Sequence, residues 1–179
     1  MGQKNETTIE LQDKRTILKR TINAPRELVF EAFTDPKHLA KWFGPRIFTA
    51  RAEGDAKPGN RFKIVMIGSD MGPVEFRGRE FPFSGIYKEV IKPEKIVMTT
   101  DLSDNPQDWQ DLIKSQITNY QGEDFLNAYR TITFEEDGKN TLVTITDEFA
   151  SNGVRDAYAK TGMKEGWAES LDKLEEMLS

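Results

Sequence analysis

The sequence predicts an α+β fold in which a long helix covers the apolar face of one antiparallel β-sheet. Two observations lead to this prediction. Between residues 47 and 149, short segments of alternating apolar and polar residues are separated by turn residues, which is typical of antiparallel strands. Near the C-terminus, apolar residues recur at helical spacing and form a single stripe made of Met163, Trp167, Leu171, Leu174 and Leu178.

At 179 residues the chain has the length of one domain and can bury a sizeable core. Residues 1–12 are predicted to be a mobile N-terminal lead-in, and residues 13–179 a single domain. The first strand is expected at residues 16–22, where Leu18 and Ile22 alternate with polar neighbours.

Residues 23–45 predict two short helices that follow one another directly. Pro25 and Pro36 each suit the first turn of a helix, and Asp35 can cap the second helix by accepting from its free amides. Gly44 and Pro45 end the second helix. The apolar faces are expected to consist of Leu28, Val29, Ala32 and Phe33 in the first helix and of Leu39, Trp42 and Phe43 in the second.

Five strands are predicted in the next part of the chain, at residues 47–52, 61–67, 74–77, 83–91 and 95–101. The third is short and lies within a segment rich in Gly and Pro. In the second, Phe62, Ile64 and Met66 share one face. The fourth leaves two phases open, because either Tyr87 with Glu89 or Ile86 with Val90 can face the interior.

A helix at residues 106–120 is expected to interrupt the sheet, with Gly122 as its stop. Two roles stay open for it: a lid over a cavity, or an appendage that covers a sheet edge. A last hairpin is predicted for 129–135 and 141–149 around a turn at 136–140.

The closing helix is predicted for residues 152–178. Gly162 and Gly166 weaken its middle, so the helix is expected to begin properly near Arg155 or to bend around Gly162.

Composition excludes several classes of function. The chain contains no cysteine, which excludes disulfides, thiolate nucleophiles and cysteine-ligated metals. Its net charge of −5 gives no electrostatic reason to expect binding to nucleic acid. No apolar run approaches the length of a membrane span, so no membrane insertion and a cytoplasmic location are expected.

No catalytic motif is present in the sequence. His38 is the single histidine, and no phosphate-binding loop, dinucleotide fingerprint or nucleophile elbow occurs. No catalytic residue, metal, nucleotide or covalent cofactor is therefore predicted. Acids in or beside strands would have raised pKa values if they faced an apolar cavity; the candidates are Asp55, Glu75, Glu80, Glu89, Asp101 and Asp147.

Three separated blocks carry a resemblance to a known family. They are the helix pair at residues 23–45, the hairpin at 85–97 and the segment 162–175, which reads GMKEGWAESLDKLE. Together they resemble START-like (SRPBCC) domains of the activator of heat-shock protein 90 ATPase homologue type, over about residues 14–178. The resemblance implies a helix-grip, Bet v 1-like fold, in which a curved antiparallel sheet wraps around the long C-terminal helix and leaves a cavity between them.

The resemblance and the many aromatic and Met residues favour non-enzymatic binding of a small hydrophobic or aromatic molecule, lipid-like or polyketide-like. The candidate cavity residues are Trp42, Phe43, Phe62, Ile64, Met66, Tyr87, Glu89, Met98, Trp109, Met163 and Trp167.

Two other functions stay open. The first is a cavity enzyme of aromatase, cyclase or hydrolase type, with Tyr87 and the acids Glu89, Asp101 or Asp147 as candidates. The second is a co-chaperone-like regulator of a heat-shock ATPase. Family members with that role carry a separate N-terminal domain, whereas about a dozen residues precede the first strand here, and nothing else indicates a protein partner.

Overall fold

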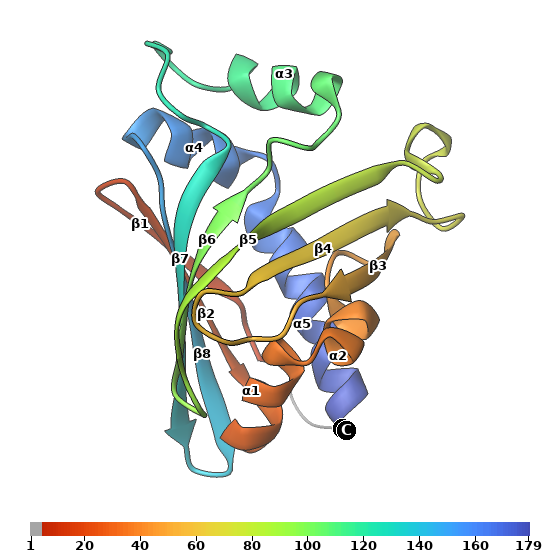
Figure 1. The fold of residues 1–179 in the computed structure, drawn as a ribbon, viewed down its shortest axis with the longest axis vertical. Coiled ribbons are helices and arrows are strands. Elements are labelled where there is room, and N and C mark those ends of the chain that lie inside the picture. The colour runs from red at the N-terminus through yellow and green to blue at the C-terminus, as the bar shows by residue number, and fades with distance from the viewer. Residues whose placement is uncertain (1–4) are drawn as a thin grey trace.

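The protein forms one eight-stranded antiparallel sheet in a computed structural model that describes residues 5–179 (Figure 1). The strand order is β1-β2-β8-β7-β6-β5-β4-β3. The strands are β1 (Thr8–Gln12), β2 (Arg15–Ile22), β3 (Phe48–Glu53), β4 (Arg61–Gly68), β5 (Glu80–Ile91), β6 (Lys95–Asp101), β7 (Asn127–Asp137) and β8 (Asn140–Glu148). The helices are α1 (Arg26–Thr34), α2 (Pro36–Trp42), the 3-10 turn η1 (Val74–Phe76), α3 (Gln107–Ser115), α4 (Asn152–Lys160) and α5 (Met163–Leu178).

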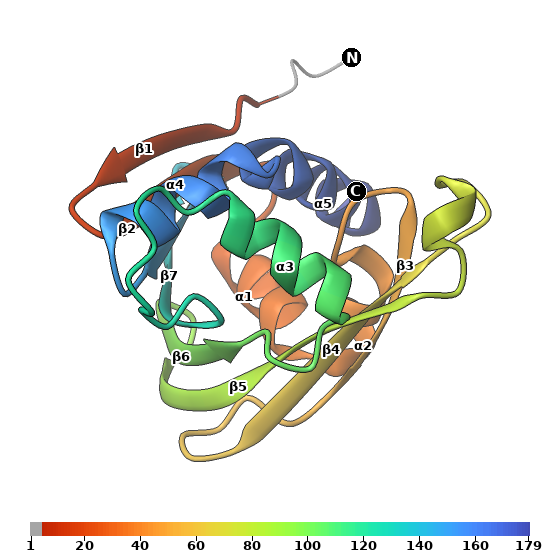
Figure 2. The ribbon, with the colours of Figure 1, turned by 90° about the horizontal axis from the view of Figure 1, so that it is seen from above.

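The sheet curves around α5, with α1 and α2 packed inside the curve at one end (Figures 1 and 2). Helices α3 and α4 lie at the other end, where α3 crosses over the space enclosed by the sheet (Figure 2). The predicted α+β class and the helix-grip arrangement are therefore confirmed. None of the helices in residues 5–179 is long and apolar enough to cross a membrane.

Part of the segment predicted as a mobile lead-in, residues 8–12, lies in the sheet. These residues form β1, which pairs with β2 from Thr8 opposite Lys19 to Gln12 opposite Arg15. Lys14, with φ 56°, makes the tight turn between the two strands. The segment TIELQ alternates polar and apolar residues, so its strand pattern was present in the sequence but was not assigned to a strand. Residues 1–4, the rest of the predicted lead-in, lie outside the described part of the chain.

The predicted helix pair is confirmed, with one change in its buried face. Asp35 caps α2 by accepting from the backbone N–H of Lys37 at 2.9 Å. Leu28 is 45% exposed, whereas Phe30 is buried and packs edge-on against Phe134 of β7, with ring centroids 5.3 Å apart. The face of α1 that meets the sheet is therefore rotated by part of a turn from the predicted face.

Three predicted elements have other bounds or forms. The short strand at 74–77 is the turn η1, which begins after Pro73 and is followed by Gly78 at φ 73°. Helix α3 ends at Ser115 rather than near residue 120. The closing helix is divided into α4 and α5 at Gly162, whose φ of 81° is left-handed and interrupts the helical ladder.

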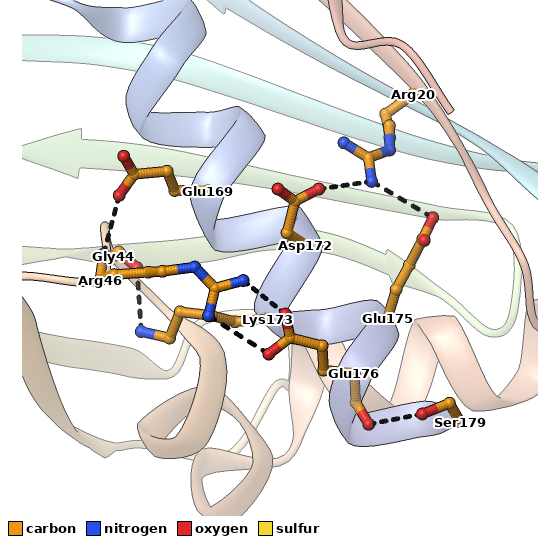
Figure 3. Close-up of polar contacts among 9 residues, drawn as sticks. All are labelled: Arg20, Gly44, Arg46, Glu169, Asp172, Lys173, Glu175, Glu176 and Ser179. Atoms are coloured by element: carbon orange, nitrogen blue, oxygen red, sulfur yellow. Dashed lines mark hydrogen bonds and ion pairs between the residues drawn. The ribbon is translucent and has the colours of Figure 1, made fainter. Parts of the chain in front are cut away.

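Buried charges attach α5 to the sheet (Figure 3). Arg20 of β2, with 1% of its side chain exposed, donates from Nη2 to Asp172 at 2.8 Å and lies 3.5 Å from Glu175. Its Nη1 donates to the Thr7 hydroxyl at 3.0 Å. Leu171 and Leu174, fully buried on the same helix, complete the contact with the core.

The other side of α5 is attached to the loop between α2 and β3 (Figure 3). Lys173 Nζ donates to the Gly44 carbonyl at 3.0 Å, and burial lowers the pKa of this amine. Glu169 accepts from the backbone N–H of Arg46 at 2.9 Å, and the Arg46 guanidinium pairs with Glu176. Helix α5 therefore bridges β2 and the α2–β3 loop, which fixes its position inside the curved sheet.

Candidate functional site

A cavity of about 250 Å³ lies between the sheet and the last two helices. Strands β4 to β8 form one wall, α4 and α5 form another, and α3 and the loop after it lie at one end. Its apolar and aromatic lining includes Phe43, Met66, Phe83, Leu102, Trp109, Phe125, Leu126, Ala128, Phe149, Tyr158, Met163 and Trp167.

Five of the predicted site residues line this cavity together. Phe43 follows α2, Met66 lies on β4, Trp109 on α3, and Met163 and Trp167 on α5. The Phe43 and Trp167 rings pack edge-on, with centroids 6.0 Å apart. These residues come from elements far apart in the sequence, and the fold brings them together in the walls of one cavity.

Another five predicted residues lie in a more densely filled part of the interior. They surround a void of only about 20 Å³ and are Trp42, Phe62, Ile64, Tyr87 and Met98. Trp42 is fully buried, and its indole N–H donates to the Ala32 carbonyl at 2.8 Å. Burial raises the pKa of Tyr87 to about 12. These five side chains are core, and the space among them is too small for a ligand.

The prediction that Glu89 can face the cavity is wrong. Its side chain is 45% exposed and lies 3.7 Å from the ammonium of Lys95. A register shift in the pairing of β5 with β6 lies between Tyr87 and Glu89. Strict alternation would place both side chains on one face, but a bulge adds a residue and turns Glu89 outward.

An ion pair in the cavity wall was not predicted, although one partner, Asp147, was a candidate acid. Arg130 of β7 lies directly opposite Asp147 of β8. Its Nε and Nη2 donate to the two Asp147 oxygens at 2.6 and 2.9 Å, with 12% and 5% of the two side chains exposed. The guanidinium carbon also lies 5.1 Å from the ring centroids of both Phe83 and Trp167.

The sequence contained a signal for this pair. In the observed register, which starts at Asp137 opposite Asn140, residue 130 lies opposite residue 147, whereas pairing outward from the predicted turn at 136–140 would place it opposite residue 146. Both residues share their strand face with buried apolar residues, Ile132 on β7 and Ile145 on β8. A charged residue at an inward position of each strand, with opposite signs across the ladder, predicts a buried cross-strand ion pair.

The hydroxyl groups of the cavity wall already donate their hydrogens to backbone carbonyls. Tyr158 donates to Phe125 at 2.5 Å, and burial, reinforced by the charges of Asp124 and Asp147, raises the pKa of this phenol. The other three donors are Thr100 to Ala128 at 3.4 Å, Thr161 to Tyr158 at 2.8 Å and Ser170 to Gly166 at 2.8 Å. These hydroxyl oxygens remain available mainly as acceptors.

The residues considered for catalysis do not gather in one place. Tyr87 lies in the packed core and Glu89 at the surface. Asp101 accepts from the backbone N–H of Ser103 at 2.8 Å, and both oxygens of Asp147 are held by Arg130.

His38 is absent from the cavity lining and lies beside Glu31 and Asp35. One ligand atom of each lies within 4.8 Å of the others. Acidic groups commonly gather at protein surfaces without a metal ion, so this cluster assigns no metal site.

Helix α3 covers the cavity rather than a sheet edge. The two edges of the sheet are β1 and β3, whereas α3 places Trp109 in the cavity lining, next to Tyr158 with ring centroids 6.4 Å apart. Asn105, before the helix, donates to the Pro82 carbonyl at 2.6 Å, and Arg79 pairs with Asp108 at 2.6 Å. Of the two roles considered for this helix, its position favours the lid.

Solved structures with the same fold come from several bacteria. Protein NE0264 from Nitrosomonas europaea is 25% identical over 94% of this chain and 96% of its own, with a TM-score of 0.71. Protein Ms6760 from Mycobacterium smegmatis is 19% identical over 97% and 96% of the two chains, with a TM-score of 0.74. A protein from Rhodobacter sphaeroides is 18% identical over 97% of each chain, with a TM-score of 0.76.

Among curated proteins, none matches the chain. A sequence profile described as Activator of Hsp90 ATPase homolog 1-like protein matches residues 23–179. These residues span the helix pair, the six strands β3 to β8 and both closing helices, and they leave out only the first hairpin, β1 and β2, among the described elements. This stretch is most of the chain and agrees with the resemblance carried by the three sequence blocks. The chain therefore belongs to the Activator of Hsp90 ATPase homolog 1-like protein family.

Proposed function

We propose that this protein binds a small, mainly apolar molecule in the cavity between its sheet and helices α4 and α5. The observation that carries the proposal is the cavity of about 250 Å³ with largely apolar and aromatic walls. Apolar cavities of about 150 Å³ can hold benzene. A molecule with two fused rings is therefore a reasonable size for this one.

The composition of the walls supports binding. Phe43 and Trp167 offer rigid aromatic surface, while Met66 and Met163 have flexible side chains that can adapt to a ligand's shape. An unfilled apolar space lowers stability, because the surrounding side chains lose packing contacts. A bound apolar molecule would restore those contacts.

The polar groups favour binding over catalysis. The Asp147 carboxylate accepts two short hydrogen bonds from Arg130 and is thus occupied. The wall hydroxyls donate to backbone carbonyls, which leaves none of them paired with a general base.

Titration with neutral fused-ring compounds, beginning with naphthalene, tests the proposal through tryptophan fluorescence. Trp109 and Trp167 line the cavity, whereas Trp42 is buried in the core. A Trp42→Phe background therefore confines the signal to the two cavity tryptophans. We expect a saturable change in emission.

A cavity-filling variant supplies the specificity control. Ala128 of β7 lines the cavity, so Ala128→Phe should weaken binding at least about tenfold by occupying the space. Thr131→Phe on the same strand adds a ring at a position outside the cavity lining and should leave binding unchanged. The absence of saturable binding, or binding unaffected by Ala128→Phe in a folded protein, would contradict the proposal.

A further inference from the structure

The guanidinium of Arg130 is held in a fixed orientation at the cavity wall. The side-on contact with Asp147 uses Nε and Nη2, and the rings of Phe83 and Trp167 lie 5.1 Å from its central carbon. Because a guanidinium is planar and rigid, this contact also fixes the direction of the third nitrogen, Nη1, which points away from Asp147.

Nη1 of Arg130 has no hydrogen-bond partner among residues 5–179, although Arg130 lines the cavity. The same holds for the indole N–H groups of Trp109 and Trp167. The hydroxyls of the wall direct their hydrogens to backbone carbonyls. The side-chain hydrogens of the cavity wall that make no hydrogen bond therefore belong to N–H groups. A ligand that complements them needs a hydrogen-bond acceptor.

The charge of the pair restricts the kind of acceptor. Asp147 neutralises Arg130 through two charged hydrogen bonds, so the pair presents a strong donor without a net positive charge. A carboxylate would have to lose its hydration in a mainly apolar space next to the Asp147 carboxylate. A neutral carbonyl loses much less hydration and still satisfies Nη1.

We infer that the ligand of this cavity is an apolar molecule with a neutral oxygen acceptor, such as a ketone, ester or amide carbonyl, that binds Nη1 of Arg130. This inference rests on the proposed function and names the class of ligand. Arg130 is its specificity-determining residue, and Asp147 and the two rings position the guanidinium.

Three compounds with the same fused-ring system test the inference by calorimetric titration of the wild-type protein. Tetralin has no acceptor, 1-tetralone adds one carbonyl, and 1,2,3,4-tetrahydro-1-naphthoate adds a carboxylate. We expect 1-tetralone to bind at least about tenfold more tightly than tetralin, because hydrogen bonds to charged groups are among the stronger ones. The carboxylate should bind more weakly than the ketone.

The double variant Arg130→Met with Asp147→Leu removes both charges and leaves neither one buried alone. It should bind tetralin and 1-tetralone with equal affinity. Arg130→Lys provides a second variant, which keeps the positive charge but loses the planar fork, and it should also lose most of the preference for the ketone.

The outcomes separate this inference from the proposed function. Equal binding of tetralin and 1-tetralone to the wild type would overturn the inference and leave the proposed function standing. Tightest binding of the carboxylate would also overturn it, since recognition would then follow charge. A ketone preference that persists in the double variant would show that another group binds the carbonyl. Failure of both neutral compounds to bind would count against the proposed function itself.

Discussion

Arg20 and Arg130 are both buried arginines, but their partners give them different roles. Arg20 contacts two carboxylates and the Thr7 hydroxyl at the interface of β2 and α5. Arg130 contacts one carboxylate and keeps a nitrogen available at the cavity. The contacts of Arg20 join β2 to α5, whereas the contacts of Arg130 leave its Nη1 without a hydrogen-bond partner among residues 5–179.

Replacing Arg20 should strongly destabilise the protein. Arg20→Met removes the cation that faces Asp172 and Glu175, and breaking a buried pair in this way costs about 3 kcal/mol. Urea denaturation measures the change. The matched control is Arg51→Met, which removes an exposed ion pair with Glu80 and should change stability little. Similar losses for both variants would show that burial of Arg20 is not the cause.

Because the phenol of Tyr87 is buried, we expect the protein to lose stability at high pH. Its pKa is raised by burial to about 12, above the value of about 10 for a free phenol, so the folded state holds this proton more tightly. The resulting stability is fully present below about pH 10 and is lost as the pH rises through about 12. By linkage, a difference of about two pKa units amounts to about 3 kcal/mol.

Urea denaturation between pH 9 and 12 should therefore show a shallower fall in stability for Tyr87→Phe than for the wild type. The variant keeps some dependence, because burial also raises the pKa of Tyr158. An identical fall in both proteins would mean that Tyr87 ionises in the folded state as a free phenol does.

Single residues of the site were predictable only in part. Side-chain type identified Trp167 and Met163, because flat and adaptable apolar groups are what a ligand cavity needs. Strand alternation failed at Glu89, since a bulge is a property of the paired strands and leaves no mark in the periodicity of one. Arg130 required the cross-strand register as well as its residue type.

At the level of elements, the break between α4 and α5 determines where the cavity ends. Gly162 at the break and Met163 after it both line the cavity, and among residues 5–179, apart from its chain neighbours, no heavy atom lies within 4 Å of a Cβ built on Gly162. The left-handed backbone, rather than crowding, is therefore what favours glycine there.

Two glycine-to-alanine variants in this region should have opposite effects. Gly162→Ala places a side chain at φ 81°, which costs about 1 kcal/mol. Gly166→Ala lies inside α5, where its Cβ would meet only Pro45 Cγ at 3.5 Å, an ordinary contact, so improved helix propensity should stabilise by about 0.5–1 kcal/mol. Thermal unfolding measures both changes. Destabilisation by both variants would contradict this account of the break.

The elements with strong periodicity or clear caps were predicted well, as the match of α2 and β6 to their predicted residues illustrates. The exceptions are short. β1 is a five-residue edge strand whose alternation extends over the single segment TIELQ, and η1 lies in a Gly- and Pro-rich loop whose form depends on contacts with β4. Local sequence carries little information about elements that tertiary contacts define.

For the whole molecule, the family resemblance supplied what periodicity does not contain, namely that the sheet curves around the final helix. Alternation predicted strands, and the helical stripe predicted a covering helix. Neither specifies curvature, which arises from sheet twist and bulges. The size of the cavity depends on how far the side chains of both surfaces fill the space, so it follows only from the assembled fold.

The interior is divided into a tightly packed part around Trp42 and a hollow part around Arg130. The aromatic cluster of α1, α2 and β7 packs the first part, whereas side chains around the hollow part have space beside them. If the proposed function holds, relatives that keep the first region and vary the second would retain the same architecture and bind different molecules. Redesign for a new guest molecule should accordingly begin at positions such as Ala128, Leu126 and Met163, far from the residues that keep the protein folded.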